Sequence, residues 1–581
     1  MDSLNCADFR NPIFGYFLKK SRFSPLFIFG IPELIFCLYL GNAEAQTVPS
    51  QVLPDRFEKR FEEPEVPKFK KKFKAPKLKE SPLDPKLDMF RFILKDILIE
   101  GSSVYKKGDF FSLYKKHLDR EVSMADVYRL AADFTAKYRN DGYILSKVTV
   151  PPQRIEKGLI RVKVVEGYIS KINIKGDASD SDRLLKKFGK KIRRSRPLKS
   201  TVLERYTLLA NDLPGLQVKS VLSPSKKKPG ASQLTFIVKH QVLEGSVGLD
   251  NRGSKFSGPM VGSLSVKENS ALGLSESTEI LATSSTQTEE VIYAKLTHEE
   301  PLGFDGAKFK LSGSLSLTEP GHTLKEFEVK GKSKVVSALI THPWIRTREE
   351  NLTSFFGFTA LNSKTDVLGE LSSRDRLRSI YLRTGYDWVD AYGGVNLINF
   401  EMRRGFNLLD ATKTGTADLT RARGESDYSK FSGGFTRLQF IAPQWMLFAS
   451  SAWQYSFSHL LASEEFTVGG SEFGRGYDFS EISGDQGWSA KAELRFAQSL
   501  RWKYFRDMQY YVFFDYGSVW ERGADEGTDA KQTLATTGGG VRYNLTRRLS
   551  GYFELAKPLA ARVEAEDHKH FRLFFKVFYR Y

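Results

Sequence analysis

Hydrophobic residues follow two different spacings along the 581-residue chain. Between about residues 88 and 242, some stretches show helical spacing and others alternate, which predicts an α+β region. Apolar residues from Val127 to Tyr138 indicate one helix, which Asn140-Asp141-Gly142 ends, and a second helix is expected around Leu203. The expected strands cover residues 143–150, 159–165, 169–174 and 234–238. We therefore expect two small tandem modules, each with helices lying on a sheet.

From about residue 243 to the end, alternating strands separated by turns replace this pattern. In the last strand, Phe571, Tyr581 and the apolar residues at every second position between them share one parity, while Arg572, Lys576 and Arg580 share the other. Turning a basic side chain toward lipid costs roughly 2–4 kcal/mol near the bilayer midplane. We therefore expect a transmembrane strand from Phe571 to Tyr581 with aromatic residues on the lipid side and basic residues inside.

Short turns separate the expected strands of this region at regular intervals. They are expected near Ala271, Pro301, Pro343, Ala391, Pro443, Leu500 and Arg547. Seven turns on one side imply about sixteen strands, an even number as bacterial barrels require. A soluble β-sandwich would explain any one pair of strands, but not the longer loops on the other side. The fold class predicted is a transmembrane antiparallel β-barrel preceded by two α+β domains.

The first 45 residues are typical of a signal peptide. Lys19, Lys20 and Arg22 precede an apolar core, and a small-x-small sequence ends at Ala45, so cleavage is expected between Ala45 and Gln46. A single-pass membrane anchor is the alternative. Both cysteines of the chain lie in this segment, so the mature protein is expected to contain no disulfide.

Residues 46–87 contain seven prolines, eleven Lys or Arg and seven Asp or Glu, which is the composition of a tether. One part of it, from Pro54 to Glu63, has phenylalanines four residues apart and is expected to form a short, mostly charged helix. The net charge of +19 raises the question of nucleic acid. An exported protein meets little nucleic acid, so acidic cargo or lipid phosphates are the expected anionic partners, and the dense basic run at residues 186–199 is expected to be a solvated face.

Few residues point to catalysis. Gly470-Ser471 lacks the glycine that a nucleophile elbow needs two residues after the serine. Thr297-His298-Glu299-Glu300 lacks the second histidine of a zinc-binding helix. We therefore expect neither an enzyme nor a metal or cofactor.

Two stretches of the α+β region resemble POTRA domains of two-partner secretion transporters, the haemolysin secretion/activation family (ShlB/FhaC/HecB-like). The first contains Asp141-Gly142-Tyr143-Ile144 and Val164-Val165-Glu166-Gly167-Tyr168-Ile169. The second contains Arg196-Pro197-Leu198, Leu203-Glu204-Arg205 and Asn211-Asp212-Leu213-Pro214-Gly215. Asp250-Asn251-Arg252-Gly253 lies where such transporters enter their barrel.

Two barrel motifs extend the resemblance. Gly474-Arg475-Gly476-Tyr477 resembles the tip of the family's long inward-folded loop, and Phe513-Phe514-Asp515-Tyr516-Gly517 resembles its F-x-D-x-G strand. An aliphatic residue commonly precedes the loop arginine, and Gly474 departs from that pattern. By strand parity Asp515 and Gly517 face the lumen, so an Arg475–Asp515 ion pair is expected to hold the loop inside the barrel. The alternative is a solvated arginine and an ordinary pore-lining aspartate.

The resemblance implies an outer-membrane translocator that moves a large exoprotein of haemolysin or adhesin type to the cell surface. Its POTRA domains would capture the exoprotein in the periplasm, lipid would surround the barrel, and the barrel-assembly machinery would insert it. The expected order is a signal peptide (1–45), a short helix and linker (46–87), POTRA 1 (88–167), POTRA 2 (168–242) and the barrel (243–581). A barrel-assembly factor and a passive solute pore are the alternatives.

Overall fold

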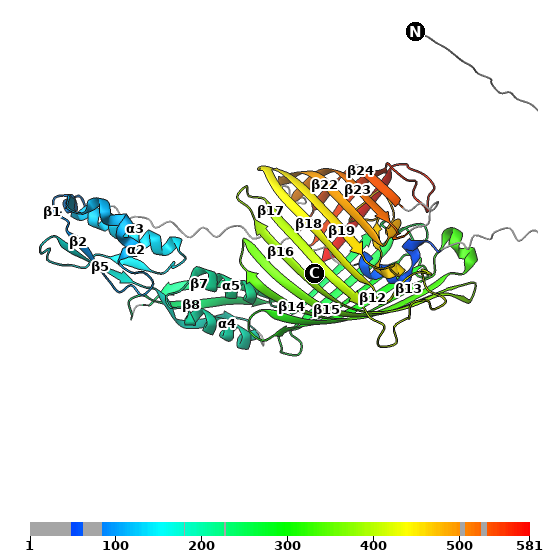
Figure 1. The fold of residues 1–581 in the computed structure, drawn as a ribbon, viewed down its shortest axis with the longest axis horizontal. Coiled ribbons are helices and arrows are strands. Elements are labelled where there is room, and N and C mark those ends of the chain that lie inside the picture. Colours follow the sequence, from blue (N-terminus) through cyan, green and yellow to red (C-terminus); the bar gives the residue numbers. More distant parts are fainter. Residues whose placement is uncertain (1–47, 62–83, 179–180, 226–227, 500–505, 524–530) are drawn as a thin grey trace, which may run out of the picture. The chain divides into compact units, whose positions relative to one another are not determined.

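The computed structural model describes residues 48–61, 84–178, 181–225, 228–499, 506–523 and 531–581 (Figure 1). The expected signal peptide and its cleavage site at Ala45 and Gln46 lie outside these residues. Among the helices of the described ranges, none combines the length and the apolar character needed to cross a membrane.

The first α+β module packs helices against a three-stranded sheet in the order β2-β5-β4, with a separate pair β1-β3. Its helices are η3 (Pro85–Asp88), α2 (Gly108–Tyr114), η4 (Lys115–His117) and α3 (Met124–Asn140). Its strands are β1 (Arg91–Ile93), β2 (Asp96–Glu100), β3 (Glu121–Ser123), β4 (Lys147–Thr149) and β5 (Leu159–Val165). The apolar stripe of α3 supplies buried residues to the core, as its spacing predicts.

The strand expected at residues 143–150 is wrong in length, because only β4 is a strand. Gly142 has a φ of 93°, and the chain then turns, with the Ser146 N–H donating to the Tyr143 carbonyl. The ring of Tyr143 packs edge-on against Tyr138 instead of pointing from a sheet.

The second module repeats this architecture with a sheet in the order β6-β8-β7. Its elements are β6 (Tyr168–Gly176), α4 (Asp182–Arg194), α5 (Ser200–Asn211), β7 (Leu216–Pro224) and β8 (Ala231–His240). The basic run that we expected only as a solvated face includes most of α4, whose Leu185, Phe188 and Ile192 are buried in the core. Strand β8 leads through two residues into the barrel.

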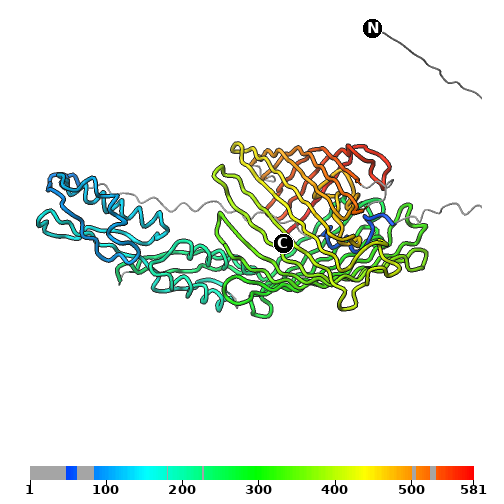
Figure 2. The backbone as a smooth tube through the Cα atoms, in the orientation of Figure 1, coloured from blue at the N-terminus to red at the C-terminus, as the bar shows by residue number. Residues whose placement is uncertain are grey.

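The barrel is closed by sixteen strands, each hydrogen-bonded to its neighbours, and β26 pairs with β9 to complete the ring (Figures 1 and 2). The first eight are β9 (Leu243–Asp250), β10 (Val261–Asn269), β11 (Ser277–Ser285), β12 (Val291–Leu302), β13 (Ala307–Thr318), β14 (Lys330–Arg346), β15 (Glu350–Val367) and β16 (Glu370–Val389). The other eight are β17 (Val395–Gly405), β18 (Ser429–Ala442), β19 (Trp445–Ser456), β22 (Gln486–Ser499), β23 (Asp507–Trp520), β24 (Lys531–Asn544), β25 (Leu549–Pro558) and β26 (Arg572–Arg580). The prediction of a sixteen-stranded antiparallel barrel is confirmed.

Within the described residues the expected short turns match the strand ends with two shifts, and the turn expected near Leu500 lies outside these residues. Pro301 lies inside β12, and its turn covers residues 303–306. Pro343 lies inside β14 at a register irregularity, and the turn itself covers residues 347–349. At the opposite end most connections are longer, although only two residues join β15 to β16, and one of the longer connections contains the short helix η6 (His322–Phe327).

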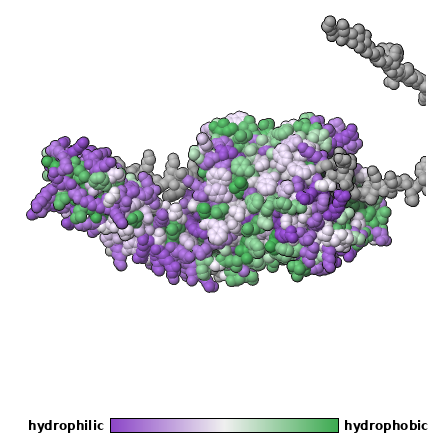
Figure 3. All heavy atoms as spheres, viewed as in Figure 1, coloured by the Kyte–Doolittle hydropathy of each residue, from purple (hydrophilic) through white to green (hydrophobic). Residues whose placement is uncertain are grey.

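Side chains on the barrel alternate between a polar interior and an apolar exterior. Figure 3 shows apolar residues distributed over its outer surface. In the last strand region, Phe571, Leu573 and Tyr581 are 62%, 60% and 67% exposed, while the side chain of Arg572 is 9% exposed and pairs with Asp478 at 2.7 Å. Phe574 shares the parity of Arg572 and also lies inside, where it packs under an arginine.

A short N-terminal segment, residues 49–61, lies inside the barrel against β12 and β13 (Figure 1). It consists of η1 (Ser50–Val52), η2 (Pro54–Arg56) and α1 (Phe57–Arg60), so the helix expected from residue 54 to 63 is shorter and begins as a 3₁₀ turn. Phe57 and Phe61 lie stacked with ring centroids 6.1 Å apart.

Candidate functional site: a loop held inside the barrel

Residues 457–485, which we call the lumen loop, connect β19 to β22 and fold into the barrel. The loop contains η7 (Ala462–Glu464) and a hairpin of β20 (Phe466–Val468) and β21 (Ile482–Gly484). Gly474 has a φ of 83°, a left-handed conformation in which an aliphatic residue would be strained. Gly474 therefore replaces the family's common aliphatic residue at a position whose backbone conformation suits glycine.

The structure brings Arg475 and Asp515 together. The Nε and Nη2 atoms of Arg475 donate to the two carboxylate oxygens of Asp515 at 2.9 and 2.6 Å. The backbone N–H groups of Gly474 and Arg475 donate to the same carboxylate at 3.2 and 3.1 Å. Arg475 is 3% exposed and Asp515 is fully buried, so the solvated-arginine alternative does not describe this geometry.

Two further carboxylates surround the same guanidinium. Nη1 of Arg475 donates to Glu493 on β22 and lies 3.5 Å from Oε2 of Glu554 on β25. The guanidinium carbon also lies 3.6 Å from the ring centroid of Phe513. Sequence reasoning placed the charge of Glu493 inside the barrel but connected neither glutamate with Arg475, because the two come from strands far apart in the sequence and carry no motif.

The glycines and the tyrosine of the two motifs make room for the loop and hold its tip. A Cβ atom on Gly517 would lie 2.6 Å from Cγ1 of Val468 in β20, so only glycine lets the hairpin approach this wall. A Cβ atom on Gly476 would lie 3.0 Å from the Pro558 nitrogen. Tyr477 is buried, and its hydroxyl accepts from the Ala561 N–H at 3.0 Å. All three inward-facing positions of the F-x-D-x-G strand therefore contact the lumen loop.

The Asp250-Asn251-Arg252-Gly253 motif contacts both the loop and the seam of the barrel. The Asn251 side chain donates to the Leu573 carbonyl at 2.8 Å and accepts from the Phe575 N–H at 2.7 Å, which ties β9 to β26. Arg252 donates to the Arg475 carbonyl at 2.9 Å and also pairs with Glu554. The sequence singled out this motif only by its position, and the structure adds these contacts.

The N-terminal segment is attached to the lumen loop and to the opposite wall. Arg56 pairs with Glu465 of the loop at 2.6 Å, and both side chains are buried. Glu58 accepts from Tyr293 at 2.8 Å and from Lys295 at 2.5 Å, both on β12. The segment and the loop therefore occupy the lumen as one hydrogen-bonded assembly.

The motifs of the first module lie at its junction with the second. The carbonyls of Gly142 and Gly167 accept from the Ser200 and Leu198 N–H groups, each at 2.8 Å. Glu166 accepts from the Ser103 N–H at 2.8 Å and from the Tyr138 hydroxyl at 2.9 Å. Burial raises the pKa of Glu166, but these hydrogen bonds outweigh burial, so its pKa lies below the ordinary value of 4.5.

The motifs of the second module lie at its junction with the barrel. The carboxylate of Asp212 accepts two hydrogen bonds from Arg346 at the end of β14, at 2.6 and 2.8 Å. Arg205 donates to the Pro343 and Trp344 carbonyls of the same strand at 2.8 and 2.9 Å. The second module is therefore joined to the barrel by charge-assisted hydrogen bonds.

The Thr297-His298-Glu299-Glu300 stretch lies on the strand β12 and not on a helix. His298 lies on β12, where its ring contacts the Thr278 hydroxyl at 2.9 Å, and Glu299 pairs with Lys308. In the described part of the chain, no group of three or more His, Cys, Asp or Glu side chains is arranged to hold a metal ion.

The chain matches two family models. Residues 230–543, more than half of the chain, match the haemolysin secretion/activation protein family ShlB/FhaC/HecB. Residues 92–167 match the POTRA domain of ShlB type.

Similar proteins are known by sequence and by structure. The heme/hemopexin transporter protein HuxB of Haemophilus influenzae (strain 86-028NP) is 22% identical over 474 residues, covering 79% of this chain and 82% of that protein. The structure of CdiB from Escherichia coli superposes with a TM-score of 0.69 at 18% identity, covering 89% of this chain and 94% of that chain. BamA from Haemophilus ducreyi, lacking POTRA domains 1–3, superposes with a TM-score of 0.51 at 14% identity, covering 84% of this chain and 100% of that chain. These two structural likenesses show a shared fold.

The family match, the closed barrel and the POTRA modules agree with one another. The chain therefore belongs to the haemolysin secretion/activation protein family ShlB/FhaC/HecB, whose members are two-partner secretion transporters of the outer membrane with periplasmic POTRA domains.

Proposed function

We propose that this protein exports a large partner polypeptide, of haemolysin or adhesin type, from the periplasm to the cell surface. The observation that carries the proposal is the filled lumen. A sixteen-stranded barrel encloses a channel wide enough for water and extended chains. Here the lumen loop and the N-terminal segment occupy that space through side-chain contacts that can break and re-form.

Capture of the partner begins at the POTRA domains. Both domains contain small sheets with edge strands, and an extended segment of the partner adds to such an edge through main-chain hydrogen bonds. The captured chain then enters the barrel after the lumen loop and the N-terminal segment move aside. The Arg475–Asp515 ion pair holds the loop in its resting position. The place where the loop packs against the barrel wall is shaped by Gly476, Tyr477 and Gly517.

Insertion of the transporter itself involves two further partners. Lipid contacts the apolar outer surface of the barrel, including Phe571 and Tyr581, and the barrel-assembly machinery inserts the precursor after the signal peptide is removed between Ala45 and Gln46. The exposed aromatic side chains of the last strand region support this part of the proposal.

A barrel-assembly factor is the second candidate, because the fold of BamA is similar. The test is comparative proteomics of culture supernatant and outer membrane from cells with and without the protein. Loss of one or a few large secreted or surface proteins, with other barrels normal, supports export. Broad loss of outer-membrane barrels would instead identify an assembly factor, and unchanged profiles in cells that express candidate partners would identify a solute pore.

A further inference from the structure

A polar site lies between the N-terminal segment and the wall of the lumen. The 3₁₀ turn η2 lies against β13, β14 and β15. Its Pro54 packs so closely on β14 that a Cβ atom on Gly331 would lie 3.0 Å from the Cγ and Cδ atoms of the proline. Asp55, the next residue, is 3% exposed, and neither of its carboxylate oxygens has a hydrogen-bond partner among the described residues.

The wall beneath this turn is lined with hydroxyl groups. Strand pairing places Ser316 of β13 opposite Ser333 of β14, and it places Gly331 between Thr318 and Thr365 of the two neighbouring strands. All four hydroxyl side chains are buried. Within the described part of the chain, none of their oxygens has a hydrogen-bond partner. Four neutral oxygen atoms are therefore available on the wall that η2 covers.

A second buried carboxylate adjoins the same wall. Asp375 of β16 is fully buried and lies opposite Ser363 of β15, which in turn lies opposite Ser333. The charges of Asp375 and Asp55 interact. The Asp375 carboxylate accepts hydrogen bonds from the backbone N–H of Thr420, at 3.2 Å, and from its hydroxyl. No basic side chain of the described ranges pairs with either aspartate.

Two basic residues close to Asp55 have other partners. Arg56 pairs with Glu465, and the Lys59 ammonium donates to the Glu465 carbonyl at 3.1 Å. Both charges act on Asp55 without a hydrogen bond to it. Burial deprives a carboxylate of its hydration, so a buried carboxylate needs a compensating partner. Asp55 and Asp375 therefore leave negative charge at this site that no neighbouring side chain is bonded to.

We propose that Asp55, Asp375 and the hydroxyl groups of the wall bind a divalent cation, Ca²⁺ in preference to Mg²⁺. Carboxylate and hydroxyl oxygens are the ligands that hard cations prefer. Ca²⁺ takes roughly six to eight oxygen ligands in a flexible geometry, whereas Mg²⁺ demands a nearly ideal octahedron. Strand pairing holds the hydroxyls, and Asp55 comes from a separate segment, so this arrangement suits the more tolerant ion. The bound cation ties the N-terminal segment to the wall.

The site lies near the end of the barrel away from the POTRA domains. Strand β13 ends at Thr318, and β14 begins at Lys330, whereas the second POTRA domain contacts Arg346 at the other end of β14. Because the POTRA domains are periplasmic, the site is on the side of the barrel that faces the cell exterior. The cation therefore stabilises the filled lumen near its outer end.

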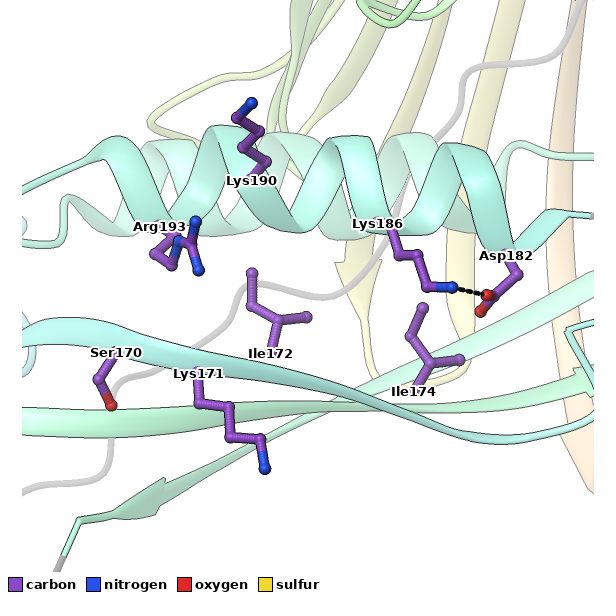
Figure 4. Close-up of a pocket in the computed structure, with 8 residues that line it drawn as sticks. All are labelled: Ser170, Lys171, Ile172, Ile174, Asp182, Lys186, Lys190 and Arg193. Carbon is purple, nitrogen blue, oxygen red and sulfur yellow. Dashed lines mark ion pairs between the residues drawn. The ribbon is translucent and has the colours of Figure 1, made fainter.

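An acidic residue outside the barrel supplies the matched control. Asp182 pairs with Lys186 in a groove between β6 and α4 that Lys190 and Arg193 also line (Figure 4). Because this carboxylate has a basic partner and further basic neighbours, the groove repels cations. Asp182→Asn should therefore leave cation binding unchanged.

The test is calorimetric titration of CaCl₂ into the purified full-length mature protein in detergent, after treatment with EDTA and dialysis into metal-free buffer. The wild type and Asp182→Asn should bind Ca²⁺ equally. Asp55→Asn and Asp375→Asn each remove one charge but keep an amide oxygen, and each should weaken binding about tenfold or more. The heat-dependent shift of the barrel on gels shows whether each variant is folded.

Thermal unfolding distinguishes a bound cation from a carboxyl group that is only protonated or hydrated. Ca²⁺ should raise the unfolding temperature of the wild type and of Asp182→Asn, because a ligand that binds only the folded state stabilises it. It should raise the unfolding temperatures of the two barrel variants much less. An unfolding temperature of the wild type that does not respond to Ca²⁺, or full-strength Ca²⁺ binding by both folded barrel variants, would overturn the inference.

The tie between the segment and the wall is tested by conductance in planar bilayers. Chelation of Ca²⁺ by EDTA should raise the conductance of the wild type, because the N-terminal segment loses one of its attachments. The conductance of Asp55→Asn should not respond to EDTA. A rise of equal size in the wild type and in Asp55→Asn would contradict the inference.

Discussion

Arg475 donates three hydrogen bonds to the carboxylate of Asp515, from its backbone nitrogen, its Nε and its Nη2, at 3.1, 2.9 and 2.6 Å. Both residues are buried in the lumen, and they belong to a loop and a strand forty residues apart. Removing one partner of a buried, hydrogen-bonded ion pair costs roughly 3–5 kcal/mol, because the other charge is left without compensation. This contact is therefore a strong local constraint on the position of the lumen loop.

Replacing Arg475 by Ala should reduce export of the partner about tenfold or more, because the loop loses its main anchor. The barrel should still fold, since its sixteen strands pair through their own backbones. Export is measured by immunoblot of the culture supernatant, and folding by the heat-dependent shift of the barrel on gels.

The matched control is Arg562→Ala, which removes an exposed arginine from the neighbouring loop between β25 and β26. It should export normally. Arg475→Lys should resemble Arg475→Ala, because lysine cannot reproduce the bidentate contact. Normal export by Arg475→Ala would show that the buried pair has no part in transport.

Gly517→Ala should displace the lumen loop, because the new Cβ would lie 2.6 Å from Cγ1 and 2.9 Å from Cγ2 of Val468. Overpacking of this kind costs about 1–3 kcal/mol. The measurement is the conductance of the purified protein in planar bilayers. It should rise as the loop is displaced from its position against β23.

The second change Val468→Ala removes both clashing methyl groups and should restore the low conductance. Gly262→Ala on β10 is the control, since the neighbour nearest to a new Cβ would be the Ser284 carbonyl oxygen at 3.8 Å. Equal conductance changes in Gly517→Ala and Gly262→Ala would contradict the packing explanation.

The alternation of the last strand was enough to predict its faces. Basic residues at one parity and aromatic residues at the other leave one acceptable register in lipid, and the structure has Arg572 inside and Leu573 outside. The burial of Phe574 at the basic parity was not predictable from alternation, because it depends on the arginine at position 252 above its ring.

Other features required the folded chain. The apolar residues Leu185, Phe188 and Ile192 predict a helix, but the basic residues between them made that stretch resemble a solvated run. Glu493 and Glu554 surround Arg475 only because non-adjacent strands curve around one lumen. Contacts of this kind across a barrel leave no periodic pattern in the sequence.

The turn at residues 102–105 of the first POTRA domain should depend on the charge of Glu166. Its folded-state pKa is lowered, so its carboxylate stabilises this turn above about pH 4.5 and the stabilisation is lost as the pH falls through the folded-state value. Glu166→Gln should therefore speed amide hydrogen exchange at residues 102–105 at pH 7.

At a pH below the folded-state pKa of Glu166, the wild type and Glu166→Gln should exchange at similar rates, because both side chains are then neutral. Tyr138→Phe removes one donor to Glu166 and should have a smaller effect at pH 7. A difference between wild type and Glu166→Gln that persists unchanged at acidic pH would contradict the role of the charge.

Passage of the partner through the barrel can be tested with one pair of neighbouring residues. Ser312 and Leu311 are adjacent on β13, where Ser312 faces the lumen and Leu311 is 46% exposed on the outer face. Both cysteines of the chain lie within the first 45 residues, so a new cysteine is unique in the protein that the proposed cleavage after Ala45 leaves. The partner is arrested during export by a tightly folded domain fused to its C-terminal end, and cross-linking from each cysteine is measured. Export through the lumen predicts cross-links from Ser312→Cys and none from Leu311→Cys; equal cross-linking from both positions, or none from Ser312→Cys while the partner is arrested, would contradict it.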